Sequence, residues 1–172
     1  TGEVSAANSL VGSTVSNYVG NGGVTVLSNG NYVVISPAWN GSRGAVTWGS
    51  GTSGVTGTVS AANSLVGTTA GDQVGNYGVT ALNNGNYVVN SYYWDNGAVA
   101  DAGAVTWGNG TTGVTGAVSA ANSLFGITPN DSVGSSGVTA LANGNYVVSS
   151  PLWDNGAVTN AGAATWGSGT TG

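Results

Sequence analysis

The chain has no cysteine, histidine or methionine, and Arg43 is its only basic residue. Without cysteine it can form neither a disulfide nor a thiolate metal site. Its net charge is -5, whereas nucleic-acid binding requires clustered lysine and arginine, so no nucleic-acid partner is expected. No apolar run approaches the roughly 20 residues that a membrane helix needs, so no membrane span is predicted.

The shortage of ionisable side chains also argues against catalysis. Acid–base and nucleophilic catalysis need proton carriers or activated nucleophiles, and the chain offers six Asp and Glu residues with no His, Cys or Lys. The one glutamate, Glu3, lies next to the N-terminus. We therefore predict that the protein is not an enzyme and that it binds no cofactor and no metal.

Instead the chain contains an internal repeat. TGEVSAANSLVG begins at Thr1, TGTVSAANSLVG at Thr56 and TGAVSAANSLFG at Thr115, so the copies start 55 and 59 residues apart. The segment between two tryptophans, Trp39 and Trp48, is four residues shorter in the first copy than its counterparts are. The sequence predicts one repeat domain made of copies 1–55, 56–114 and 115–172.

Four extended segments are predicted in each copy. An Asn-Gly pair between β-branched runs indicates a tight antiparallel hairpin in which both turn residues take positive φ. These pairs are Asn29-Gly30, Asn84-Gly85 and Asn143-Gly144. A second hairpin is predicted where Gly44 to Trp48 returns after the Trp39 loop. The fourth strand is predicted at Val4 to Leu10, Val59 to Leu65 and Val118 to Leu124, although SAANSL also fits one helical turn capped by Ser.

This pattern predicts an all-β, β-propeller-like fold with three four-stranded antiparallel blades in the chain. The alternative is a β-solenoid, which usually has shorter periods and parallel pairing between coils. Propellers have about four to eight blades, so three blades need a second chain or neighbouring repeats to complete a ring or filament. If Val4 to Leu10 pairs with the strands near Gly137 to Trp166, the ring is closed by distant partners.

The second copy resembles a known blade. Its segments GDQVG, GVTAL, NGNYVVNS and GAVTWG, within residues 71–108, resemble the FG-GAP repeat of integrin-type propellers. The whole unit is similar to the repeat arrays of large bacterial haemagglutinin-like adhesins, which implies an extracellular or cell-surface location. FG-GAP blades often hold calcium in an Asp-rich turn, but residues 27–33, 82–88 and 141–147 contain no carboxylate, so calcium is not expected there.

Each copy carries two tryptophans. Trp48, Trp107 and Trp166 end the third strand, and we predict that they pack between adjacent blades. The others lie in the variable loop beside polar residues, where an exposed ring can stack on a sugar. The predicted glycan contacts are Trp39, Asn40, Trp94, Asp95, Trp153 and Asp154, the alternative being that the loops pack on the next blade. Four aspartates are predicted to cap turns by accepting from amides two residues ahead, namely Asp72, Asp95, Asp131 and Asp154.

Function follows from these features as a hypothesis. Edge strands normally carry Lys or Pro that prevents sheet addition, and this chain lacks such protection. We therefore predict an extracellular structural and interaction protein of bacterial adhesin type, which forms a ring or filament as a homo-oligomer or with neighbouring repeats of a longer chain. The alternative is a lectin that binds surface glycans through the loop tryptophans.

Overall fold

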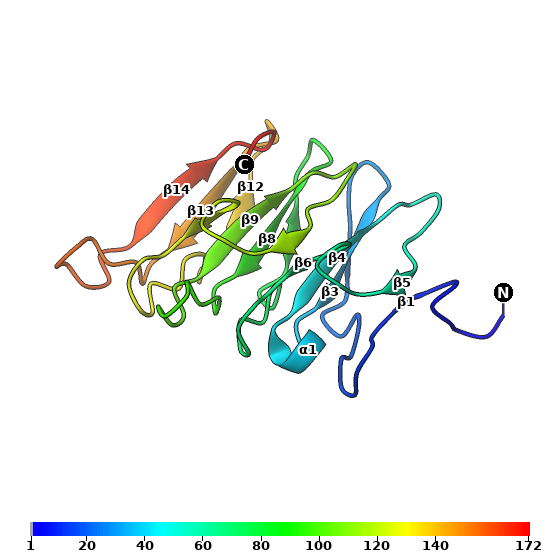
Figure 1. The fold of residues 1–172 in the computed structure, drawn as a ribbon. Coiled ribbons are helices and arrows are strands. Elements are labelled where there is room, and N and C mark those ends of the chain that lie inside the picture. The colour runs from blue at the N-terminus through cyan, green and yellow to red at the C-terminus, as the bar shows by residue number, and fades with distance from the viewer. Residues whose placement is uncertain (1) are drawn as a thin grey trace.

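The chain folds into a row of small β-sheets that lie side by side (Figure 1). The computed structural model describes residues 2–172, so Thr1, the first residue of the first copy, lies outside the described residues. The N-terminal segment lies at one end of the row and the sheet that contains β14 at the other (Figure 1). The predicted all-β character is confirmed.

The elements follow the three copies. The first copy contains β1 (Leu10–Val11), β2 (Val24–Val26), β3 (Tyr32–Ser36), the short helical turn α1 (Trp39–Ser42) and β4 (Ala45–Gly49). The second contains β5 (Gly57–Thr58), β6 (Leu65–Val66), β7 (Val79–Ala81), β8 (Tyr87–Ser91) and β9 (Ala104–Gly108). The third contains β10 (Gly116–Ala117), β11 (Ser123–Phe125), β12 (Val138–Ala140), β13 (Tyr146–Ser150) and β14 (Ala163–Gly167).

Three of the four sheets are each built on an antiparallel meander of three strands from one copy. In the second copy β7, β8 and β9 pair in this order, and β11 of the third copy adds as a fourth antiparallel strand. In the first copy β6 adds to β4 in the same way, and β10 then pairs with β6. The last sheet contains only β12, β13 and β14. The fourth strand of a sheet is therefore supplied by the following copy.

The Asn-Gly pairs lie in the turn of the first hairpin, but the turn differs from the expected one. The amide of Leu27 donates to the carbonyl of Asn31 over 2.8 Å, which leaves a three-residue loop. Gly30 has a φ of 86°, whereas Asn29 is not among the residues with positive φ. The prediction that both turn residues take positive φ is wrong, because a glycine bulge after a three-residue loop needs only one left-handed position.

The SAANSL segment is neither a continuous strand nor a helix. In the second copy the amide of Ser60 donates to Oδ1 of Asn63 at 2.9 Å, and the amide of Asn63 donates to the carbonyl of Ser60 at 3.1 Å. This local turn separates β5 from β6, because an Asn side chain competes with ladder bonds for the backbone. The predicted strands Val4 to Leu10, Val59 to Leu65 and Val118 to Leu124 are wrong in their extent, and only their C-terminal ends are extended.

Neighbouring copies also pair in parallel. β1 pairs with β5 and β6 with β10, so the end of one SAANSL segment lies beside the start of the next. β1 does not pair with the last sheet, and within residues 2–172 the row is open with no closed ring. The chain therefore combines antiparallel meanders within a copy with solenoid-like parallel pairing between copies.

The apolar core runs between adjacent sheets. One buried cluster combines Leu27 and Val33 of the first copy with Tyr87 and Val89 of the second. The loop before β4 is four residues shorter than its counterparts, yet the amide of Gly44 reaches the carbonyl of Trp39 at 3.0 Å, as Gly103 reaches Trp94 at 3.0 Å in the second copy. The deletion therefore shortens a loop without displacing the strands that pack.

Candidate interaction site

The loop tryptophans lie in the interior. Trp39 is 9% exposed and Trp94 is 4% exposed, and Trp153 is half-buried. Trp39 belongs to one apolar cluster with Val59 and Val66 of the second copy. The expectation of exposed sugar-binding rings is wrong for Trp39 and Trp94, because the following copy covers them.

The polar residues beside those tryptophans close the loops. Oδ1 of Asp95 accepts from the amide of Asp101 at 2.9 Å, and Oδ1 of Asp154 accepts from the amide of Asn160 at 2.7 Å. The amide of Asn40 donates to Oδ1 of Asn17 at 3.3 Å, in a loop where Asn40 itself is left-handed with a φ of 51°. The carboxylates of Asp95 and Asp154 and the backbone amide of Asn40 are therefore engaged in hydrogen bonds that hold the loops.

The strand-ending tryptophans join one copy to the next. Nε1 of Trp48 donates to the carbonyl of Gly110 in the second copy at 3.0 Å, and Nε1 of Trp107 donates to the carbonyl of Gly169 in the third copy at 3.0 Å. Trp166, the third member of the set, is 59% exposed. Trp48 and Trp107 therefore link the copies in one direction, because each of these two rings bonds to the copy that follows it.

The asparagines of the hairpin turns form a second link between copies. Nδ2 of Asn29 donates to Gly110 at 2.8 Å and to Gly85 at 3.3 Å, and Nδ2 of Asn31 donates to Gly110 at 2.9 Å. Asn84 and Asn86 repeat this pattern toward Gly169. This cluster is not predicted from the sequence above, although NGN, TWG and a Gly-rich tail recur in every copy.

The fourth strand is anchored by a pair of hydroxyls. Oγ1 of Thr47 lies 2.7 Å from Oγ of Ser64, and Oγ1 of Thr106 lies 2.7 Å from Oγ of Ser123. Each pair joins the last strand of one meander to the SAANSL segment of the following copy. Thr165 is the equivalent threonine of the last sheet, and no such partner is present among the described residues.

Buried carboxylates fasten the loops at the same boundary. Asp72 is fully buried, and its Oδ2 accepts from the amides of Thr68 and Thr69 at 2.8 Å each. Its Oδ1 accepts from the amide of Asp95 at 3.0 Å, and Asp131 makes the matching bonds in the third copy. The prediction that the donors lie two residues ahead is wrong. The local donors lie three and four residues earlier for Asp72 and Asp131, and six residues ahead for Asp95 and Asp154. Burial raises the pKa of Asp72, and the three amide bonds oppose that shift.

Tyr87 provides a titratable reporter of the contact. Its hydroxyl oxygen accepts from the amide of Val114 at 3.2 Å, and burial raises the pKa of Tyr87 to about 12. Tyr32 accepts from Val55 in the same way. Each of these bonds ties a meander to the segment that leads into the next copy.

Alkaline pH is expected to destabilise the protein through Tyr87. Between pH 10 and 12 the unfolded state loses this proton while the folded state keeps it, so stability falls as the pH rises, by up to about 2.7 kcal/mol. Burial also raises the pKa of Tyr92 to about 12 and raises the pKa of Tyr146, so these two tyrosines add to the same slope. Urea unfolding followed by circular dichroism at pH 9 and pH 12 measures the slope, and Tyr87→Phe should reduce it by the share that Tyr87 contributes. An unchanged slope in Tyr87→Phe would show that another group is responsible.

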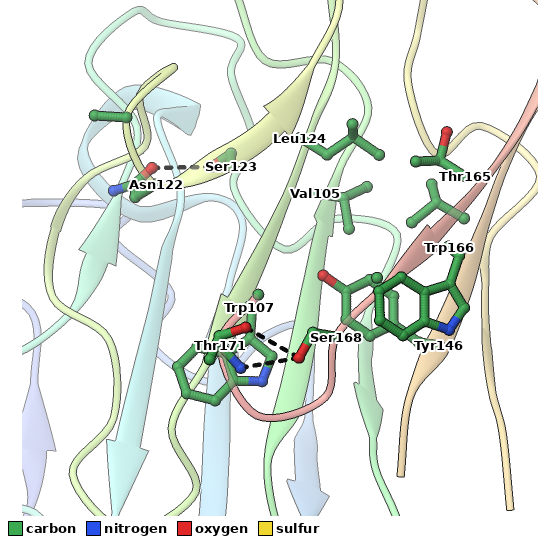
Figure 2. A pocket seen from close by; sticks show the side chains of 14 residues that line it. Val105, Trp107, Asn122, Ser123, Leu124, Tyr146, Thr165, Trp166, Ser168 and Thr171 are labelled. Carbon is green, nitrogen blue, oxygen red and sulfur yellow. Dashed lines mark hydrogen bonds between the residues drawn. The ribbon is translucent and has the colours of Figure 1, made fainter. Parts of the chain in front are cut away.

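A groove at the last sheet completes the site. It has a volume of about 400 Å³ and lies between β11 and β14. Figure 2 shows Asn122 and Ser123 on one side, and Thr165, Trp166 and Tyr146 on the opposite side. The groove is therefore lined by aromatic rings together with hydroxyl and amide groups. A ligand in it could stack on the rings and form hydrogen bonds with the polar groups.

Two further findings concern chemistry and membranes. Residues 2–172 contain no cluster of three or more His, Cys, Asp or Glu side chains that could hold a metal ion. In the same part of the chain, no helix has the length and apolar character required to cross a membrane.

Comparison with known proteins agrees with the repeat. No curated protein matches the chain. A family model described as a repeat of unknown function (DUF5650) matches residues 1–21, 26–76, 81–135 and 140–172. The last three matches begin 55 and 59 residues apart, as the three copies do, but each match starts 25 residues after the start of a copy. The chain therefore belongs to the family of proteins that carry the DUF5650 repeat.

Proposed function

We propose that this chain is a structural and interaction module of an extracellular or cell-surface protein of the bacterial adhesin type. Its propeller-like sheets act as stackable blades that assemble with further copies into a row, ring or filament. The observation that carries the proposal is that the meanders of the first and second copies each take their fourth strand from the following copy. A unit whose sheet is completed by its neighbour favours assembly into arrays, because the edge strands of its sheet leave backbone groups unpaired until another strand adds.

The resemblance to FG-GAP blades is part of this proposal. The sheet with the order β11-β9-β8-β7 is a four-stranded antiparallel unit, as a blade is. Almost no charge interrupts the surfaces, since charged residues make up 4% of the chain. Weakly charged surfaces and unprotected edges both favour association with like copies.

Assembly is tested by measuring mass against concentration. Light scattering from about 1 to 100 μM should show a mass that rises above that of the 16.6 kDa chain, because micromolar association is an ordinary strength for specific contacts. The same samples viewed by electron microscopy should show rods or rings. A sharp monomer mass over the whole range would contradict the assembly proposal.

Carbohydrate binding is the second candidate, and the groove beside Trp166 favours it. The indole of Trp166 is 59% exposed and Tyr146 lines the same groove, so a sugar face has a ring to stack on. Tryptophan fluorescence should then change with a panel of sugars at millimolar concentration, and Trp166→Ala should abolish the change. No response from the wild-type protein would rule this candidate out at that groove.

A further inference from the structure

The valine at the start of each copy is buried in the second and third copies and exposed in the first. Val59 is 2% exposed and Val118 is 3% exposed, because each lies against the preceding copy. Val4 occupies the equivalent position in the first copy and is 77% exposed. The exposed side chain of Val4 is therefore one that an earlier copy would cover, as Trp39 lies against Val59.

At the opposite end of the row, the edge strand β14 lacks the partner strand that β4 and β9 have. β4 pairs with Leu65 and Val66 of the following copy, and β9 pairs with Ser123 to Phe125. The outer edge of β14, which is equivalent to β4 and β9, has no partner among residues 2–172. Its sequence, AATWG, carries no charge and no proline that would block strand addition.

Internal symmetry fixes the register of the missing strand. The pairs Ala45 with Val66 and Ala104 with Phe125 are equivalent to Ala163 with Val11 of another chain. In that register Ser9 of the other chain faces Thr165, as Ser64 faces Thr47 at 2.7 Å. Gly2 of the other chain then lies beside Leu124, as Gly116 lies beside Leu65.

Two hollows mark the position that this segment would occupy. One is the groove of about 400 Å³ beside Trp166, and the other, of about 360 Å³, is lined by Trp153, Phe125 and Val133. Leu124 and Thr165 line both hollows. The second hollow is mainly apolar, and it would receive Val4 and Val11 beside Trp153, because Trp39 clusters with Val59 and Val66.

Hydrogen-bond donors at this end match an acceptor in a second chain. Trp48 and Trp107 donate to the tail carbonyls of Gly110 and Gly169. The equivalent donor in the last copy is Trp166, and the equivalent carbonyl in a second chain belongs to Gly51. A second chain placed at this end would therefore accept a hydrogen bond from the Trp166 indole and also fill the two hollows.

We propose that the edge of β14 binds the segment Gly2 to Val11 of a second copy of this chain, head to tail. The contact reproduces the one between copies inside the chain, and it rests on the proposed assembly function. It joins two different surfaces, so every bound chain presents a new β14 edge and the association continues into an open row.

Paired valine variants test the docking surface. Val4→Asp places a charge in the proposed contact, whereas Val15→Asp places one at a position that is 95% exposed and outside the contact. Both sites are exposed in the single chain, so both variants should fold with wild-type circular dichroism spectra. Sedimentation velocity should show that Val4→Asp weakens association at least about 100-fold, as burying an unpaired charge costs several kcal/mol. Val15→Asp should associate like the wild type.

Engineered cysteines test the register, because the chain has no cysteine of its own. Mixing Ser9→Cys with Thr165→Cys should give disulfide-linked dimers on mild oxidation, since hydroxyl pairs 2.7 Å apart place their β-carbons near disulfide range. Ser13→Cys mixed with Thr165→Cys is the matched control and should give few. Thr106→Cys with Ser123→Cys in one chain should close the equivalent internal bridge.

A third variant should strengthen the contact. The position opposite Leu10 of the incoming chain is Ala164, whereas the internal equivalents are Val46 and Val105, which are fully buried. Ala164→Val adds two methyl groups to the interface, so the dissociation constant should fall roughly tenfold.

The outcomes separate this inference from the function on which it rests. If the wild type associates while Val4→Asp associates equally well, or if Ser13→Cys crosslinks as readily as Ser9→Cys, the docking register is wrong and assembly stands. If the wild type stays monomeric up to about 100 μM, the proposed assembly fails together with the inference.

Discussion

Replacing Gly110 with alanine is expected to lower the free energy of unfolding by about 5 kcal/mol. A β-carbon at this position would overlap the carbonyl oxygen of Gly85, so the tail must move away from the hairpin turn. The carbonyl of Gly110 then leaves its three donors, the side chains of Asn29, Asn31 and Trp48. Chemical denaturation followed by tryptophan fluorescence measures the loss.

Thr111→Ala is the matched control, because Thr111 is exposed on the same tail and its side chain makes no hydrogen bond to the neighbouring copy. This variant should stay within about 0.5 kcal/mol of the wild type. A Gly110→Ala protein that is as stable as Thr111→Ala would show that the tail carbonyl does not join the first two copies.

Replacing Asp72 with alanine is expected to cost about 4 kcal/mol of unfolding free energy, because three backbone amides lose the buried carboxylate that accepts their hydrogen bonds. The amides belong to Thr68, Thr69 and Asp95, and the last of these fixes the loop after Trp94. Part of the loss is offset, since burial raises the pKa of Asp72 and the ionised form is costly in the fold. Thermal and denaturant unfolding at pH 7 measure the difference.

Asn17 supplies the control for this prediction, because the first copy has an amide where the later copies have a carboxylate. Its Oδ1 accepts from Thr14 and Asn40, while its buried Nδ2 has no partner. Asp72→Asn keeps one accepting oxygen and should cost only about 1 to 2 kcal/mol. If the alanine and asparagine variants were equally stable, the amide bonds would not be the source of the effect.

The burial of the tryptophans could not be predicted from the sequence. Both sets are flanked by polar or small residues, so local patterns do not reveal which rings face another copy. Trp94 is buried because the third copy folds over its loop, and Trp107 is half-exposed because its indole reaches across to Gly169. Burial of either ring depends on residues more than 20 positions away.

The extent of the fourth strand was decided by a local turn together with one longer-range strand pairing. A strand is predicted at Val59 to Leu65, but Asn63 bonds the backbone at Ser60 and Thr58 and forms a turn. Only Leu65 and Val66 remain extended, because β4 of the first copy offers them a ladder. A local side-chain bond thus outweighed β propensity.

The sequence alone determined the period of the repeat, because closely similar segments recur along it. It also determined the antiparallel hairpins at Asn29-Gly30 and its counterparts, and the all-β character, because these depend on residues a few positions apart. Tertiary structure decided that the fourth strand completes the preceding sheet, that β1 pairs with β5, and that the row stays open. Those outcomes depend on how neighbouring copies satisfy unpaired backbone and buried side chains, and pairs such as Trp48 with Gly110 are separated by a full repeat or more.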